Sequence, residues 1–144
     1  KKFKATHFDY CTFSGLFHKR SEKELIQHSG LLCLDFDHVG NPDKFKERLL
    51  QHDYFDTELM FTSPSGDGVK WIIPIDLKGW EHSRHFKAVA NCIKATGLPP
   101  VDKSGSDVAR SCFLPYDPQA YINPKYLEYV EENIFRPRLG ECPF

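Results

Sequence analysis

The chain has 144 residues, enough for one compact domain, and 40% hydrophobic with 27% charged residues is the balance of a folded protein. A formal net charge of −1 excludes a general polycation that coats nucleic acid, although a local basic groove is still allowed. No apolar run approaches the roughly 20 residues of a membrane helix, so we expect no membrane partner and a cytoplasmic location.

The first residues contain neither an initiator Met nor the apolar segment of a signal peptide, which suggests a piece of a longer protein. The five cysteines show no CxxC spacing, which favours buried thiols in a reducing compartment over disulfides or structural zinc.

The sequence of residues 10–18 is typical of a strand. Ser21 and Glu24 then form a capping-box pattern, which predicts a short helix as far as residue 27.

The central part of the chain predicts alternating strands and helices. We expect, in order, a strand over 30–39, a helix over 42–51, strands over 58–63 and 69–75, a helix over 83–96 and a strand over 108–114. Asn41 and Pro42 supply the start of the first helix. This βαββαβ order predicts an α+β fold of the RRM-like, ferredoxin-like kind, with both helices on one sheet face and the other face open.

The domain organisation follows from the same elements. Residues 1–144 are expected to form one domain with a core over 29–118, and residues 1–28 form an N-terminal extension. Asn123 and Pro124 predict a C-terminal helix over about 124–134.

Two carboxylates stand at the end of the first core strand. Asp35 and Asp37 are two residues apart, so both project from the same face of the sheet, while Leu34 and Phe36 point to the other. Adjacent carboxylates repel each other unless a cation relieves the repulsion. Mg²⁺ or Mn²⁺, which carboxylates coordinate, is the cation expected at such a site. The alternative is a strand that ends in a polar turn.

A glycine-rich loop and a second acidic segment follow. Glycines 66 and 68 permit backbone N–H groups to face an anion, the hydroxyls of Ser63 and Ser65 add donors, and Lys70 supplies a charge for a phosphate. The alternative is a flexible connection between strands.

In the segment 102–110, Asp107 or Asp102 can approach the first carboxylates, because the first and last strands of an RRM-like sheet are neighbours. Arg110 can then bind a phosphate bidentately. The alternative is a surface pair between an aspartate and an arginine.

The segments TFSGLF (12–17), HSGLLCLDFDHV (28–39), FTSPSGDGVKWIIPI (61–75) and DKSGSDVARSCFLPYDP (102–118) together resemble the N-terminal domain of virulence-associated protein E. That family is placed in the archaeo-eukaryotic primase, or primase-polymerase, superfamily. The resemblance implies an RRM-like catalytic core that acts on nucleoside triphosphates and on single-stranded or primed DNA or RNA. It also implies a helicase or other module in the same polypeptide, in replication of a mobile element or phage.

The resemblance also implies roles for individual residues. Asp35, Asp37 and Asp107 match the metal ligands, with Asp102 as a second candidate for the third position. The nucleotide-binding positions match Ser63, Ser65, Gly66, Gly68, Lys70 and Arg110. The chain departs from the superfamily where Lys70 stands in place of a histidine, because lysine holds a phosphate but carries protons poorly near neutral pH.

The leading hypothesis is a nucleotidyltransferase that depends on Mg²⁺ or Mn²⁺ and makes or extends a primer. The alternatives are a non-catalytic module that binds nucleotides or single-stranded nucleic acid, and a metal-dependent nuclease. The sequence leaves open the sugar of the nucleotide, the need for a template and the oligomeric state.

Overall fold

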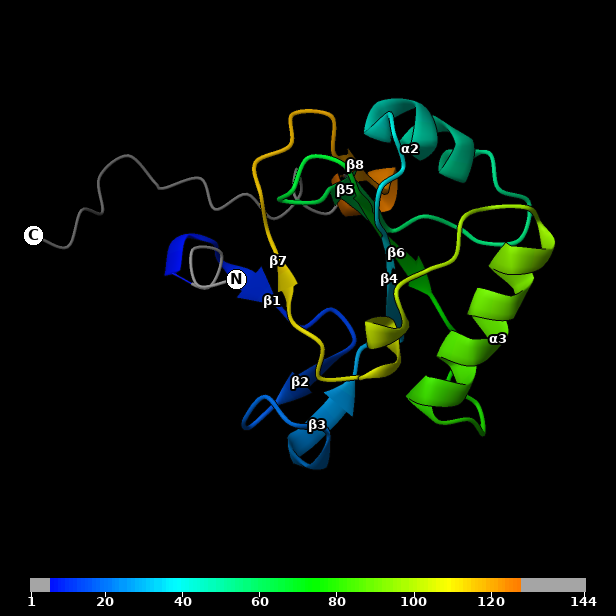
Figure 1. The fold of residues 1–144 in the computed structure, drawn as a ribbon. Helices are drawn as coiled ribbons and strands as arrows, with labels where there is room; N and C mark the ends of the chain where they lie inside the picture. The colour runs from blue at the N-terminus through cyan, green and yellow to red at the C-terminus, as the bar shows by residue number, and fades with distance from the viewer. Residues whose placement is uncertain (1–5, 128–144) are drawn as a thin grey trace, which may run out of the picture.

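Strands and helices alternate along residues 6–127, the part of the chain that the computed structural model describes (Figure 1). The fold is α+β with antiparallel sheets and is compatible with a ferredoxin-like arrangement, as the sequence predicts. The elements, in order, are β1 (Tyr10–Cys11), β2 (Gly15–Phe17), η1 (Glu22–Glu24), β3 (Leu25–His28), β4 (Leu31–Phe36), α2 (Pro42–Leu50), β5 (Leu59–Thr62), β6 (Val69–Pro74), α3 (His82–Ala95), η2 (Lys103–Ser106), β7 (Cys112–Phe113) and β8 (Tyr121–Ile122).

The central sheet has the strand order β4-β6-β5-β8, and every neighbouring pair is antiparallel. Helices α2 and α3 cover one face of it (Figure 1). The core lies between them, and Trp71 is completely buried there with its indole N–H donating to Thr57 at 2.8 Å. Each large apolar side chain that is fully buried stabilises the fold by about 1.5–3 kcal/mol. The core side chains from the sheet are Leu32, Leu34, Phe36, Met60, Val69, Trp71 and Ile73.

The predicted start of α2 is confirmed in detail. The side chain of Asn41 accepts a hydrogen bond from the Lys44 N–H at 3.0 Å, and Pro42 occupies the first helical position. Phe45 and Leu49 face the core, as the spacing predicts.

The N-terminal extension differs from the prediction. The helix expected over residues 21–27 is a short 3₁₀ turn followed by strand β3, and Ser21 makes no side-chain cap. Strand β3 pairs instead with β2, where Leu25 fills the space that a side chain at Gly15 would occupy. The predicted strand over 10–18 is likewise interrupted by a turn at residues 12–14. Pairing between segments therefore overrides the local capping signal.

The last predicted core strand is also different. It shrinks to β7 and pairs with β1, not with β4. The chain before η2 runs beside the end of β4 instead, because the Asp102 N–H donates to the Asp35 carbonyl at 2.8 Å. Gly105 packs there so tightly that an added Cβ would lie 2.6 Å from the Phe86 ring.

The second face of the sheet is not open. Strands β1, β7, β2 and β3 lie on the side away from α2 and α3 (Figure 1), and Cys112 of β7 packs on Phe61 and Ile72. This layer closes over part of the sheet and forms a wall of the cavity described below.

The C-terminal helix begins as predicted, with residues 124–127 helical, and the rest of its predicted span lies outside the described residues. Edge strand β8 was not predicted. Within residues 6–127, no helix combines the length and the hydrophobicity that crossing a membrane requires.

Candidate functional site

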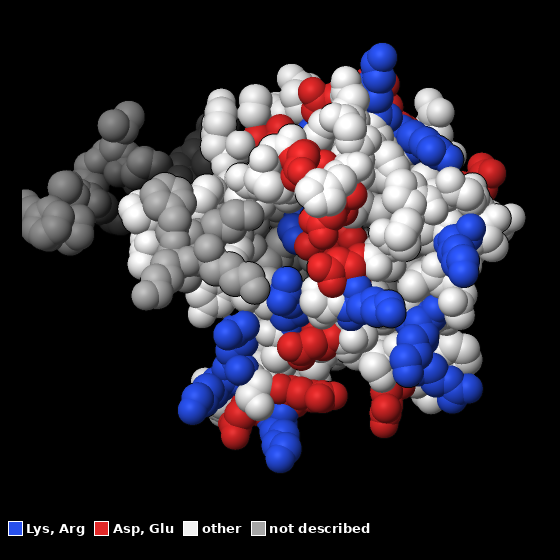
Figure 2. Space-filling model, viewed as in Figure 1, with Lys and Arg blue, Asp and Glu red and all other residues white. Residues whose placement is uncertain are grey.

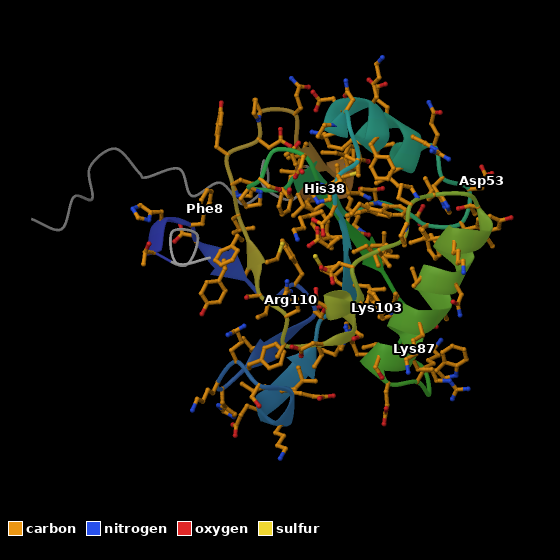
Figure 3. All side chains as sticks on the ribbon, viewed as in Figure 1. Phe8, His38, Asp53, Lys87, Lys103 and Arg110 are labelled. Carbon is orange, nitrogen blue, oxygen red and sulfur yellow. The ribbon has the colours of Figure 1, made fainter. Side chains whose placement is uncertain are left out.

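A polar cavity of about 600 Å³ lies between the central sheet and the segment that leads into β7. Carboxylates and cations lie side by side near the middle of this face of the molecule (Figure 2). Arg110, which is labelled in Figure 3, is one of the cations that line the cavity. Segments far apart in the sequence line it: Asp35, Asp37, Ser63, Pro64, Ser65, Lys70, Asp102, Arg110, Ser111 and Phe113.

Asp35 and Lys70 form an ion pair on the floor of the cavity. They are direct cross-strand partners in the β4–β6 register, and the antiparallel ladder therefore holds both side chains on the same face. Asp35 is nine-tenths buried. Burial raises the pKa of Asp35, the Lys70 ammonium opposes this, and the neighbouring carboxylates of Asp37 and Asp102 raise the pKa further.

Asp102 is the third carboxylate of the cavity. Its side chain caps η2 by accepting from the Ser104 N–H at 2.7 Å, and that hydrogen bond, with the charges of Arg110 and Lys70, lowers its pKa. Asp107, the first choice from the sequence, does not line the cavity. Its exposed carboxylate accepts from the Ala109 N–H at 2.9 Å, because residues 108 and 109 form a turn where the last strand was expected to begin.

The loop between β5 and β6 contributes serine hydroxyls to the lining of the cavity, whereas its glycines lie outside the cavity. Ser63 and Ser65 line the cavity, with their oxygens 2.8 Å apart. Gly66 lies outside it and has φ of +82°, which a glycine adopts at little cost. Gly68 also lies outside it, and it packs so closely that an added Cβ would lie 2.5 Å from the Phe36 carbonyl oxygen. The backbone conformation at Gly66 and the close packing at Gly68 therefore explain why glycine occupies these positions, without any need for anion binding.

Sequence reasoning missed several lining residues. Pro64, Ser111 and Phe113 also face the cavity, and only their adjacency to Ser63 and Arg110 could have indicated them. Phe61 and Trp71 are buried in the core. His38, beside the carboxylates in the sequence, is exposed and contacts Asp67 at 2.6 Å.

The carboxylates suit a hard divalent cation in one respect. Asp35 Oδ1 is buried and has no hydrogen-bond partner within residues 6–127, so one strong acceptor is unused. Over the same residues, no three His, Cys, Asp or Glu side chains are already arranged as a metal site. The residues of the cavity that could hold a cation are Asp35, Asp37 and Asp102.

Two histidines support the segment that carries Asp102. The Gly30 N–H donates to His28 Nδ1 at 3.0 Å, so His28 Nε2 bears the proton and donates to His82 Nδ1 at 3.0 Å. His82 Nε2 then donates to the Gly105 carbonyl at 3.0 Å. Both rings are neutral in this chain of hydrogen bonds, which ties η2 to α3 and β3.

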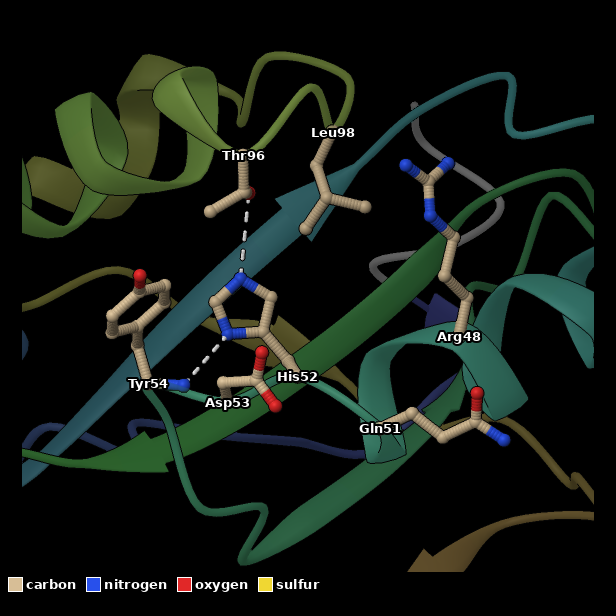
Figure 4. A pocket seen from close by; sticks show the side chains of 7 residues that line it. All are labelled: Arg48, Gln51, His52, Asp53, Tyr54, Thr96 and Leu98. Carbon is tan, nitrogen blue, oxygen red and sulfur yellow. Dashed lines mark hydrogen bonds between the residues drawn. The ribbon is translucent and has the colours of Figure 1, made fainter.

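A smaller pocket of about 230 Å³ lies beyond the C-terminal ends of α2 and α3 (Figure 4). His52 accepts there from the Tyr54 N–H at 3.3 Å and faces the Thr96 hydroxyl at 3.4 Å, and its ring stacks on Phe55. Burial lowers the pKa of His52. The ring packs against its neighbours, so this pocket is a packing feature of the helix ends.

The fold and the cavity define a class: a small α+β domain with a mixed-charge cavity on the sheet face opposite its helices. The chain belongs to the BT4734-like N-terminal domain family, because the model of that family matches residues 2–122. No curated protein and no solved structure matches the chain.

The resemblance to the N-terminal domain of virulence-associated protein E is therefore wrong, because the family that matches is a different one. Part of the pattern behind it has structural causes: Gly68 permits close packing, and Asp35 pairs with Lys70 across two strands. Assignment to the primase superfamily, the helicase neighbour and the mobile-element context depended on that resemblance alone and have no support from the family that matches.

Proposed function

We propose that this domain is a divalent-metal-dependent nucleotidyltransferase that transfers nucleotides from nucleoside triphosphates to the end of a nucleic-acid strand. The observation that carries the proposal is the cavity itself, in which three carboxylates, two cations and three serine hydroxyls converge from four separate segments. Such a mixture suits a metal triphosphate, since the carboxylates hold the cation while lysine and arginine hold the phosphate oxygens.

The Asp35–Lys70 ion pair supports this proposal, because each of the two charges can exchange its present partner for a part of a metal triphosphate when that ligand binds. Without a ligand, each charge neutralises the other on the buried floor. A metal triphosphate offers Asp35 a cation and offers Lys70 a phosphate, so both buried charges stay compensated throughout. The unused oxygen of Asp35 would supply a ligand to the cation.

The remaining residues have roles that follow from their positions. Ser63 and Ser65 donate hydrogen bonds to phosphate oxygens from one wall, and Arg110 faces the charge that develops on the transferred group from the other wall. Asp35, Asp37 and Asp102 would hold the cation. When bound, Mg²⁺ or Mn²⁺ supplies acidification of the attacking hydroxyl and neutralisation of phosphate charge.

Titration calorimetry tests the proposal directly. MnCl₂ and a nonhydrolysable nucleoside triphosphate are titrated into the wild type and into Asp35→Asn and Asp102→Asn. We expect both substitutions to weaken metal-dependent triphosphate binding at least tenfold. Without metal, Asp35→Asn should bind triphosphate as well as the wild type or better, because it releases Lys70 from its partner.

Asp107→Asn is the matched control, because Asp107 lies outside the cavity and this variant should bind as the wild type does. Primer-extension assays follow, in which lengthened strands support the transferase and shortened strands indicate a nuclease. Full metal-dependent binding and incorporation by Asp35→Asn would refute the proposal.

One observation favours a second candidate, a non-catalytic module that binds nucleotides or single-stranded nucleic acid. Lys70 already occupies one oxygen of Asp35, and among residues 6–127 no three metal-ligating side chains are arranged as a site. This candidate predicts binding that is sensitive to salt but indifferent to Mn²⁺ and to Asp35→Asn.

A further inference from the structure

A second hollow of about 650 Å³ adjoins the polar cavity and shares with it the wall Ser63, Pro64 and Ser65. Its volume falls within the roughly 300–1,000 Å³ typical of small-molecule sites. The other sides are formed by the β7–β8 loop, the start of α2, the end of β5, the β5–β6 loop and Phe8, two residues before β1. The residues are Phe8, Pro42, Asp43, Thr62, Gly66, Pro115, Tyr116, Asp117, Pro118 and Gln119. Figure 3 places Phe8 beside the upper end of β7.

Tyr116 is the unusual residue of this hollow, because 92% of its surface is exposed. A large aromatic side chain at such exposure contributes little to the core, and it presents a flat face to solvent. Pro115 on one side of it and Pro118 two residues beyond it restrict the backbone of the loop. The tyrosine therefore stands on a stiff segment.

The loop is also tied down from beneath. The Asp117 carboxylate accepts from the Thr62 N–H at 2.7 Å, from the Gln119 N–H at 2.9 Å and from Lys46 at 2.9 Å. Lys46 is almost fully buried in α2. These bonds fix the loop to β5 and to α2, so the hollow is preformed.

The charge of the hollow distinguishes it from the neighbouring cavity. Lys46 is neutralised by Asp117 and Asp43, and none of the residues that line the hollow is a lysine or an arginine. The Asp43 carboxylate is about two-thirds exposed and offers acceptors to amino or hydroxyl groups. Such a lining does not suit a phosphate, but it suits an uncharged aromatic ring and a sugar.

We propose that this hollow is the nucleobase subsite of the same ligand whose phosphates occupy the polar cavity, with Tyr116 as the stacking surface. The inference rests on the proposed function, because it assumes that the phosphates of a nucleoside triphosphate bind in the polar cavity. The ligand crosses the Ser63–Ser65 wall, with its phosphates toward Lys70 and Arg110 and its base toward Tyr116.

The test compares two probes in the presence of MnCl₂: inorganic tripolyphosphate, which has no base, and a nonhydrolysable nucleoside triphosphate. Stacking of one base on an aromatic side chain strengthens binding by about 5- to 150-fold. We therefore expect Tyr116→Ala to weaken nucleoside triphosphate binding at least fivefold and to leave tripolyphosphate binding unchanged. Tyr116→Phe should retain the wild-type affinity for both.

Tyr54→Ala is the control, since Tyr54 is also an exposed tyrosine but lines the remote pocket at the helix ends. If Tyr116→Ala weakens both probes alike, or neither, the nucleobase subsite is overturned while the proposed function stands. If the wild type binds neither probe, the proposed function itself fails and the subsite fails with it.

Discussion

The ion pair between Lys46 and Asp117 links α2 to the loop after β7, and breaking it should cost much of the stability of the domain. Both side chains are more than nine-tenths buried. Burial alone would raise the pKa of Asp117, but hydrogen bonds from the Thr62 and Gln119 N–H groups and from Lys46 outweigh it and lower the pKa to about 2.

The magnitude follows from that pKa. The difference between the ordinary value of 3.8 and about 2 corresponds to ~2.5 kcal/mol, which solvent screening reduces to about 1–2 kcal/mol. In Asp117→Asn, Lys46 also loses a buried partner, although it keeps Asp43 and the Gln119 carbonyl at 3.0 Å each. We expect the free energy of unfolding at pH 7 to fall by about 2–3 kcal/mol.

The pH dependence has a definite sign. Because folding lowers the pKa of Asp117, its contribution is complete above about pH 3.8 and disappears as the pH falls toward 2. The stability difference between wild type and Asp117→Asn should therefore shrink over that interval by about 1–2 kcal/mol.

Urea denaturation between pH 7 and pH 2.5, followed by the fluorescence of the buried Trp71, measures this difference. The control is Asp76→Asn, which makes the same substitution in an exposed pair with Lys78 and should change stability by less than about 1 kcal/mol. Equal costs for the two variants, or a difference that does not change with pH, would refute the reasoning.

Two further predictions concern the segment that carries Asp102. Gly105→Ala places a Cβ 2.6 Å from the Phe86 ring and 2.9 Å from the Cys33 carbonyl, so thermal unfolding should show a loss of about 1–3 kcal/mol; a wild-type melting temperature would contradict this. Burial lowers the pKa of both His28 and His82, so the unfolded state binds more protons below pH 6.5 and the free energy of unfolding should fall between pH 7.5 and pH 5.5. Urea titrations should show a weaker pH dependence in His82→Gln, and an unchanged dependence would show that the pair is not responsible.

Local signals in the sequence were sufficient for helices α2 and α3 and for the central strands β4, β5 and β6. The side chain of Asn41 caps α2 because an N-cap acts within three residues, and Pro42 fixes a backbone angle of its own. The apolar spacing in α3 buries Phe86, Val89 and Ile93 on one face. These features require no knowledge of distant segments.

The candidate site was predictable to the same extent. Asp35 and Asp37 could be placed on one sheet face because side chains alternate along a strand. The loop hydroxyls and Lys70 follow from their position between two recognisable strands. That these residues line one cavity agrees with the sequence-based expectation, whereas the chemistry assigned to them is still a proposal.

Only the tertiary structure decided which segments pair across long distances. The region after Ser21 forms β3 and not a helix because pairing with β2 outweighs a single capping pattern. Strand β7 joins β1, about a hundred residues earlier in the chain, and η2 takes the place expected for a strand beside β4. As a result Asp102, not Asp107, lies in the cavity.

The sequence also did not indicate which charged side chains are buried. Lys46 lies in a helix with an amphipathic sequence. Nothing near it in the sequence indicates that it will pair with Asp117, which is 71 residues further along the chain. A short segment has few local preferences of its own, so the free energy of its distant contacts determines its structure and its neighbours.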